Sequence, residues 1–342
     1  MQALEKEWLL RMPELAHKKI VSIYFGGGTP SLLGPERLQA IIQWIQRDVG
    51  FDPMKTEITL EANPENITTQ LMKDYASTGI NRVSIGVQTL SESLLKKLER
   101  QHDAQKAIDA VSATLKAGIG NITIDLMYDL PNQTLEIWEE TISKASQLPI
   151  QHLSLYNLTI EPHTSFFKHQ EELQKTLPDP DISLKMYEKA QETLTASGLK
   201  QYEISAFARE GYQSRHNTGY WKARPFLGFG PSAFSYWDSI RFRNIAHLRR
   251  YAYQLDQGKF PVDFKEQLDE QASLRELLTI RLRLCEGVHL VYFEGEYGQL
   301  DKETLKNIEQ LENKGYIERN NEIIRLTKQG ILFYDSVAVD LI

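Results

Sequence analysis

Short apolar segments alternate with amphipathic segments along the chain as far as residue 207. The apolar segments are rich in branched and aromatic residues, which is typical of buried strands. The segments between them carry apolar residues at helical spacing. We expect strands at 20–25, 57–61, 82–88, 121–128, 152–160 and 201–207, and helices at 3–12, 68–78, 91–98, 104–117, 134–147 and 180–197, with another helix starting at Pro35.

This alternation predicts an α/β fold with a parallel sheet and helices on its outer faces. Right-handed connections made in chain order would curl the sheet into a full or partial (β/α) barrel. An open, doubly wound sheet is the other arrangement that the pattern allows. We expect this sheet to occupy a first domain, residues 1–207.

Two further regions follow this domain. Residues 208–262 break the alternation and are rich in aromatic residues and glycine. Residues 263–342 predict a small α+β domain of winged-helix-like order, in which a hairpin turns at Asn320 and Asn321. A winged helix often binds DNA, but the acidic residues of this domain favour a packing role. Its expected elements are helices at 268–285, 293–297, 302–314 and 327–341 and strands at 315–318 and 323–326.

The first strand leads directly into a glycine-rich segment, Gly26, Gly27, Gly28 and Thr29. Glycine has no Cβ and reaches backbone angles that other residues avoid, so a ligand can approach the main chain closely. The alternative is a tight turn before the next helix, since glycine clusters mostly mark turns.

Polar residues also lie at the ends of the later strands. Parallel α/β folds bind ligands at the carboxyl edge of the sheet, and a carboxylate there can accept hydrogen bonds from ribose hydroxyls. Taken singly, each acid could instead cap the next helix. Because they follow successive strands, we predict one ligand edge, which comprises Glu61, Gln88, Asp125 and Thr159 together with the glycine segment.

Residues 215–237 form an aromatic and glycine-rich stretch that opens with His216, Asn217, Tyr220 and Trp221. We expect a loop here that could close over a planar apolar ligand, with the histidine as an axial ligand to a haem iron. The alternative is that the polar pair ties the loop to itself while the aromatic rings pack.

Composition narrows the classes of function. The net charge of -7 argues against a nucleic-acid-binding surface over the whole protein. No stretch of the sequence predicts a membrane-spanning helix, and the acidic start does not resemble a secretory signal, so we expect a cytoplasmic location. The single cysteine, Cys285, excludes a disulfide framework and a multi-cysteine metal site built by these residues alone.

Several motifs together resemble the HemW haem chaperones, which are radical-SAM-fold relatives of oxygen-independent coproporphyrinogen III oxidase. They are YFGGGTPSLL, LEANPENIT, RVSIGVQTL, LERQHD, ITIDLMYDLPNQT, LSLYNLTIEPHTSF and RHNTGYW, in this order. The resemblance extends from about residue 3 to the C-terminus. Asp129 departs from the pattern, in which glycine is usual.

The resemblance implies two sets of ligand-binding residues. S-adenosylmethionine (SAM) would be held by Gly26, Gly27, Gly28, Thr29, Glu61, Gln88, Arg100, Asp125 and the backbone near Thr159. Haem would be handled by His216, Asn217, Tyr220 and Trp221. The second set also distinguishes the chaperone branch from the oxidase.

The family's loop of three cysteines, which holds a [4Fe–4S] cluster, has no counterpart in these 342 residues. Residues 3–12 correspond to the helix that follows that loop. We expect the first barrel strand and the cysteine segment to lie upstream of Met1, because without that strand residues 20–25 would form an uncovered sheet edge. A [4Fe–4S] cluster is expected only if such a segment exists.

The resemblance therefore predicts a haem chaperone that delivers haem to acceptor haemoproteins, with the membrane surface as one place for transfer. It implies no nucleic-acid partner and leaves a homodimer open. Two alternatives remain: oxygen-independent coproporphyrinogen III oxidase, whose radical chemistry would need the absent cysteines, and a degenerate SAM-fold binding protein. The motif that begins at His216 favours the chaperone.

Overall fold

The computed structural model describes residues 1–159 and 165–342. The chain forms two compact units, each built from separate stretches of sequence. Unit 1 comprises residues 1–20, 45–51 and 214–342, and unit 2 comprises residues 21–44 and 52–213. The division that the sequence suggested, at residues 207 and 262, stays a prediction.

Unit 2 is built around a seven-stranded sheet of order β1-β2-β3-β4-β5-β7-β6. The first five strands are parallel and lie side by side in chain order. A doubly wound sheet would reverse its strand order, so the order confirms the partial (β/α) barrel. The strands are β1 (Ser22–Phe25), β2 (Glu57–Ala62), β3 (Arg82–Gln88), β4 (Asn121–Tyr128), β5 (His152–Asn157), β6 (Lys200–Glu203) and β7 (Ala206–Ala208).

The last strand of this sheet differs from the expectation. The segment expected as one parallel strand at 201–207 divides into β6 and β7, which pair antiparallel to each other. β7 also pairs antiparallel to β5, so the sheet is mixed at this edge. At the other edge is β1, the strand that leads into the glycine segment.

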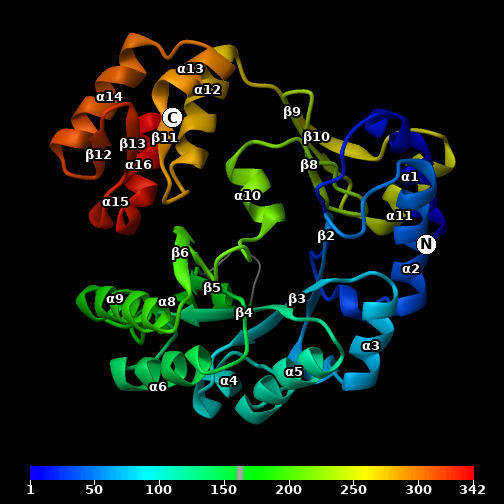
Figure 1. Ribbon diagram of the computed structural model, residues 1–342, viewed down its shortest axis with the longest axis horizontal. Helices are drawn as coiled ribbons and strands as arrows, with labels where there is room; N and C mark the ends of the chain where they lie inside the picture. Colours follow the sequence, from blue (N-terminus) through cyan, green and yellow to red (C-terminus); the bar gives the residue numbers. More distant parts are fainter. Residues whose placement is uncertain (160–164) are drawn as a thin grey trace. The chain divides into compact units, whose positions relative to one another are not determined.

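Helices cover one face of the sheet, as Figure 1 shows for α3, α5 and α6. Three of these helices begin at a threonine or aspartate whose side chain accepts a hydrogen bond from the first turn. The helices of unit 2 are α2 (Pro35–Asp48, whose last turn belongs to unit 1), α3 (Thr69–Ser77), α4 (Glu92–Lys97), α5 (Ala104–Lys116), α6 (Leu135–Ser146), α7 (Ser165–Lys168), α8 (Gln170–Gln174) and α9 (Pro180–Ala196), with 3₁₀ turns at Pro30–Leu32 and Pro64–Asn66.

The parallel strands alternate in polarity. One row of side chains, represented by Leu60, Ile85 and Ile124, is apolar and fully buried. The opposite row carries polar groups such as Thr123 and Ser154. Successive residues of a strand face opposite sides of the sheet, so the helix-covered face is apolar and the other face is polar. The polar face is therefore suited to hold a polar ligand.

Unit 1 combines the first helix of the chain with its last 129 residues (214–342). It contains a three-stranded antiparallel sheet, β10-β9-β8, and a second one, β11-β13-β12. The elements are α1 (Gln2–Arg11), a 3₁₀ turn (Met12–Leu15), α10 (Arg215–Trp221), β8 (Phe234–Trp237), β9 (Ile240–Asn244), α11 (Leu248–Asp256), β10 (Val262–Glu266), α12 (Glu270–Arg281), β11 (Val288–His289), α13 (Leu290–Tyr297), α14 (Lys302–Asn313), β12 (Ile317–Asn320), β13 (Ile323–Leu326), α15 (Lys328–Leu332) and α16 (Tyr334–Leu341).

The C-terminal part of unit 1 confirms the small winged-helix-like α+β domain, with three differences. The hairpin turns at Asn321, whose φ is +53°, one residue later than expected. A further strand, β11, pairs with β13. The closing helix expected at 327–341 divides into α15 and α16 at Phe333. No helix among the described residues is long and apolar enough to cross a membrane.

Candidate functional site

The glycine segment and Glu61 meet at the carboxyl ends of β1 and β2. The backbone N–H of Gly27 donates to Oε2 of Glu61 at 3.2 Å, and the Tyr24 hydroxyl donates to Oε1 at 2.7 Å. A Cβ on Gly26 would lie 2.8 Å from Oε1 of Glu61, so only glycine fits this approach. At Gly28 a Cβ would meet nothing within 4 Å, so the outer side of the loop has room for a ligand.

Asp125 lies on the polar face, at the third parallel strand along from the glycine loop. The Ser84 hydroxyl donates to its Oδ2 at 3.0 Å, and Ser154 also donates to it. Burial raises the pKa of Asp125 to about 6, the nearby charge of Glu61 adds to this, and the two serines oppose it. The carboxylates of Glu61 and Asp125 are therefore close enough for the charge of one to affect the other, and Asp125 can change its protonation near neutral pH.

Two tyrosines complete this polar face, and the sequence analysis missed both. Burial raises the pKa of Tyr24, and the charge and hydrogen bond of Glu61 raise it further. Burial and the charge of Asp125 raise the pKa of Tyr156. Both phenols stay protonated, so they are hydrogen-bond donors. Their position on the same strand row as the acids was the available signal, since residues i and i+2 share a face.

Gln88 ends β3 in a left-handed conformation, with φ +66°. The pairing with β4 shifts register between Ile85 and Gln88, which marks a bulge. A Cβ at Gly86 would lie 3.0 Å from the Gln88 amide nitrogen, so the glycine gives this side chain its room. Bulges redirect side chains at functional edges, which agrees with a ligand role for Gln88.

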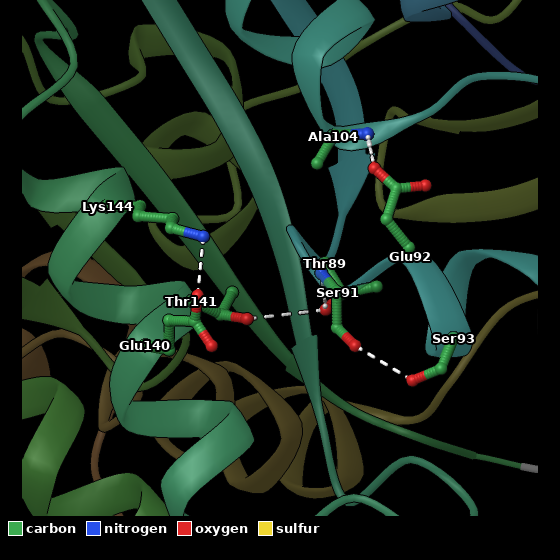
Figure 2. Close-up of polar contacts among 8 residues, drawn as sticks. All are labelled: Thr89, Ser91, Glu92, Ser93, Ala104, Glu140, Thr141 and Lys144. Atoms are coloured by element: carbon green, nitrogen blue, oxygen red, sulfur yellow. Dashed lines mark hydrogen bonds and ion pairs between the residues drawn. The ribbon is translucent and has the colours of Figure 1, made fainter.

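The loop after Gln88 is tied to two helices (Figure 2). The Thr89 hydroxyl lies 3.5 Å from the hydroxyl of Thr141 on α6, and it accepts from the backbone of Ser91. Glu92 accepts from the backbone N–H of Ala104 at the start of α5. These contacts fix the segment between the bulge at Gln88 and Arg100.

Arg100 and Thr159 are the remaining members of the predicted SAM set. Arg100 is half-buried, and burial lowers its pKa while the charge of Glu65 opposes this. Thr159 is exposed beyond the end of β5. The structure thus brings the glycine loop, Glu61 and Asp125 together. Gln88 lies at the end of β3, Arg100 lies between α4 and α5, and Thr159 follows β5.

The predicted haem motif is a helix, so the expectation of a loop was wrong. Ser214 caps α10 by accepting from the backbone N–H of Asn217 at 3.2 Å. A serine N-cap stabilises a helix because it satisfies an otherwise unpaired N–H. Within a helix, residues four apart share a face, so His216 and Tyr220 come together. Asn217 is half-buried in the first turn.

His216 is half-buried in a position that favours its neutral form. Its Nε2 lies 2.7 Å from the Tyr220 hydroxyl, and the two rings meet edge to face with centroids 4.8 Å apart. Burial lowers the pKa of His216 to about 4, and the positive charge of Arg224 contributes. A neutral imidazole is the form that can coordinate a metal ion.

Arg224 and Arg283 fix the two ends of α10 in unit 1. The Arg224 guanidinium donates to the Arg215 carbonyl oxygen at 3.1 Å. A Cβ at Gly219 would lie 3.0 Å from that guanidinium, so the glycine lets it lie against the helix. The Arg283 guanidinium lies over the Trp221 ring, 4.3 Å from its centroid, in a cation–π contact. Nε1 of Trp221 is buried with no hydrogen-bond partner in the described part of the chain.

The fold and the strand-end site define a class, the radical SAM proteins. Residues 2–145 match the Radical SAM superfamily, and residues 268–333 match the HemN C-terminal domain. The solved structure of coproporphyrinogen III oxidase (HemN) from Escherichia coli, a radical SAM enzyme, superposes with a TM-score of 0.86 at 23% identity. The match covers 99% of this chain and 82% of that one, and it shows that the two proteins share a fold.

Curated relatives narrow the class to one family. The heme chaperone HemW of Bacillus subtilis is 32% identical over 98% of this chain and 89% of its own length. The heme chaperone HemW of Lactococcus lactis is 33% identical, covering 92% of this chain and 82% of its own. That of Escherichia coli is 33% identical, covering 94% and 83%. The chain belongs to the HemW haem chaperone family.

Proposed function

We propose that this protein is a haem chaperone that binds haem at α10 and passes it to acceptor haemoproteins. Relatives named heme chaperone HemW match it over nearly its whole length. The observation on this chain that carries the proposal is His216, an imidazole kept neutral within an aromatic helix. Neutral imidazole is a common axial ligand of haem iron.

Each residue of the motif has a separate role in the proposal. His216 offers a nitrogen to the iron, and the rings of Tyr220 and Trp221 supply apolar surface for the porphyrin. Asn217, one residue from the histidine and half-buried, offers an amide to the polar rim of haem. A ligand held by one axial bond and stacking can also be released, which delivery requires.

We propose further that the strand ends of unit 2 hold SAM. Gly26, Gly27, Gly28 and Thr29 would receive its amino-acid end, and Glu61 would accept from its ribose. The open space at Gly28 and the partly buried carboxylates fit a polar ligand. Gln88, Arg100, Asp125 and the backbone at Thr159 would line the rest of the pocket. SAM would supply an adenosyl group and a sulfonium charge at this edge.

These 342 residues do not fit a [4Fe–4S] cluster. Such a cluster needs three thiolates on one loop, and the sequence contains one cysteine, Cys285. Within the described residues, no group of three or more His, Cys, Asp or Glu side chains could hold a metal ion. Haem delivery as proposed does not depend on a cluster.

A haem titration tests the proposed function. We expect the purified chain to bind one haem, with a shift of the Soret band, and the substitution His216→Ala to weaken binding by about tenfold or more. His169→Ala is the matched control, because His169 is exposed and makes no side-chain capping bond. A titration in which neither the parent chain nor the variant changes the Soret band would contradict the proposal.

The same protein can be tested against the other two functions. Conversion of coproporphyrinogen III to protoporphyrinogen IX would favour the oxidase. Binding of SAM without any binding of haem would favour a degenerate SAM-fold protein. Three expectations from the sequence stay predictions: the cytoplasmic location, transfer at the membrane surface and a homodimer.

A further inference from the structure

The nitrogen of His216 that haem iron would use is already engaged. Nε2 lies 2.7 Å from the hydroxyl of Tyr220, one turn further along α10. If Nε2 accepts the phenol proton, its lone pair is occupied, and if it donates, it carries a proton itself. In both cases Nε2 cannot bind iron until this hydrogen bond breaks.

The ring of Tyr220 is also held from its other side. Phe226 meets it edge to face, with centroids 4.5 Å apart. Phe226 is itself fixed, because its backbone exchanges two hydrogen bonds with Tyr236 of β8, at 2.8 and 3.0 Å. Phe226, fixed by its β-bridge to Tyr236, therefore holds the Tyr220 ring in place, with the Tyr220 hydroxyl against the imidazole of His216.

We propose that Tyr220 is a latch on the haem site, whose hydroxyl competes with iron for Nε2 of His216. This inference rests on the proposed function, since it takes His216 as the axial ligand. When haem enters, the hydrogen bond to Tyr220 breaks and the iron–nitrogen bond forms. When haem leaves, Tyr220 closes on the imidazole again, which favours release to an acceptor.

The substitution Tyr220→Phe tests the latch, because it removes the hydroxyl and keeps the ring against Phe226. In the variant no hydrogen bond to Nε2 has to break before haem binds, so we expect haem binding to be tighter by about three- to tenfold. The association rate gives a second readout in stopped-flow mixing. In the parent chain the rate levels off at high haem concentration because opening of the latch limits it, and in the variant it continues to rise.

A double-substitution cycle separates this effect from a general change in packing. In the His216→Ala background, Tyr220→Phe leaves haem affinity unchanged, because the group that the latch covers is absent. Tyr236→Phe is the matched control and has no effect, since Tyr236 contacts Phe226 through its backbone. Near-UV circular dichroism verifies that each variant is folded.

The outcomes for the latch and for the proposed function differ. Tyr220→Phe could bind haem more weakly than the parent chain, or with equal affinity and rate. In either case the proposed competition between Tyr220 and iron is wrong, even if His216→Ala still loses binding. If His216→Ala binds haem as the parent chain does, His216 is not the axial ligand, and the proposed function is wrong on this point. Tighter and faster binding by Tyr220→Phe, abolished by His216→Ala, supports the latch.

Discussion

Asp125, a residue of the proposed ligand edge, lowers the stability of the folded protein. Its carboxyl lies on the polar face with a pKa of about 6, raised mainly by burial. An unfolded aspartate has a pKa of about 3.9. Between these values the folded chain retains a proton that the unfolded chain has lost, so this group lowers stability as the pH rises from about 4 to 6.

We therefore predict that Asp125→Asn stabilises the protein at pH 7.5 by about 1 to 2 kcal/mol, because it removes the cost of a buried charge. The gain should shrink toward pH 4.5, where the parent carboxyl is protonated. Urea unfolding followed by circular dichroism at the two pH values measures it. The control is Asp109→Asn, since Asp109 is exposed and accepts a hydrogen bond from the Gln105 side chain. A loss of stability at pH 7.5 would contradict this interpretation.

The backbone conformation of Asp129 explains one departure from the family pattern. Asp129, where the resemblance leads us to expect glycine, adopts φ +59° just after β4. Glycine adopts this conformation without strain, and aspartate is among the few other residues that tolerate it. Its Oδ2 accepts from the Asn157 side chain at 2.7 Å, which offsets part of the strain. The departure is therefore compatible with the loop geometry.

At the scale of elements, α1 is held in unit 1 by one buried acid. Glu7 is fully buried and accepts from the backbone N–H of Gly230 at 2.7 Å and from the Tyr251 hydroxyl at 2.6 Å. The Asn244 amide donates to its other oxygen. Burial raises the pKa of Glu7, and these bonds oppose the change. One side chain thus joins the first helix to segments more than 220 residues away in the sequence.

Glu7→Ala would remove an acceptor shared by three buried donors, of which Asn244 retains a bond to the Gly230 carbonyl oxygen. We predict a loss of about 3 kcal/mol or more in unfolding free energy. Glu5→Ala on the same helix is exposed and should change stability by less than about 0.5 kcal/mol. Denaturant titrations of the two variants and the parent chain compare these values. Equal, small effects would show that α1 is held by its apolar contacts instead.

The parallel strands were predictable because their apolar segments are short and separated by clear helices. The break between β6 and β7 was not predictable. The two residues between these strands, Ile204 and Ser205, are neither glycine nor proline, so nothing in the sequence marks a turn there. The three strands β8, β9 and β10 were missed for a related reason. The sequences of β9 and β10 interleave charged residues with apolar and aromatic ones, and β8 and β10 are only four and five residues long. Such short segments depend on their strand partners for stability.

The geometry of the proposed ligand edge could be predicted in part. Strand ends indicated Glu61 and Asp125, which the structure brings to one face. The register shift before Gln88 depends on how β3 meets β4, and a single sequence does not contain that information. The helix at His216 was missed because Gly219 disfavours a helix, and the arginine that lies against it comes later in the chain.

At the scale of the whole molecule, the two proposed ligands use separate compact units. The SAM set lies in unit 2, and the haem motif lies in unit 1. Each set has its own supporting contacts: Tyr24 and Gly27 hold Glu61, and Tyr220 holds His216. This separation makes the two binding activities distinguishable by single substitutions.

We predict that Glu61→Gln weakens SAM binding by about tenfold or more and leaves haem affinity unchanged. The amide cannot replace the charged acceptor for ribose hydroxyls or for the donors Tyr24 and Gly27. His216→Ala should have the reverse effect. Calorimetry with SAM and Soret titration with haem, run on both variants, give the four affinities. If Glu61→Gln weakened both ligands equally, occupation of the strand edge would be coupled to haem binding, and SAM would act as an effector of the chaperone.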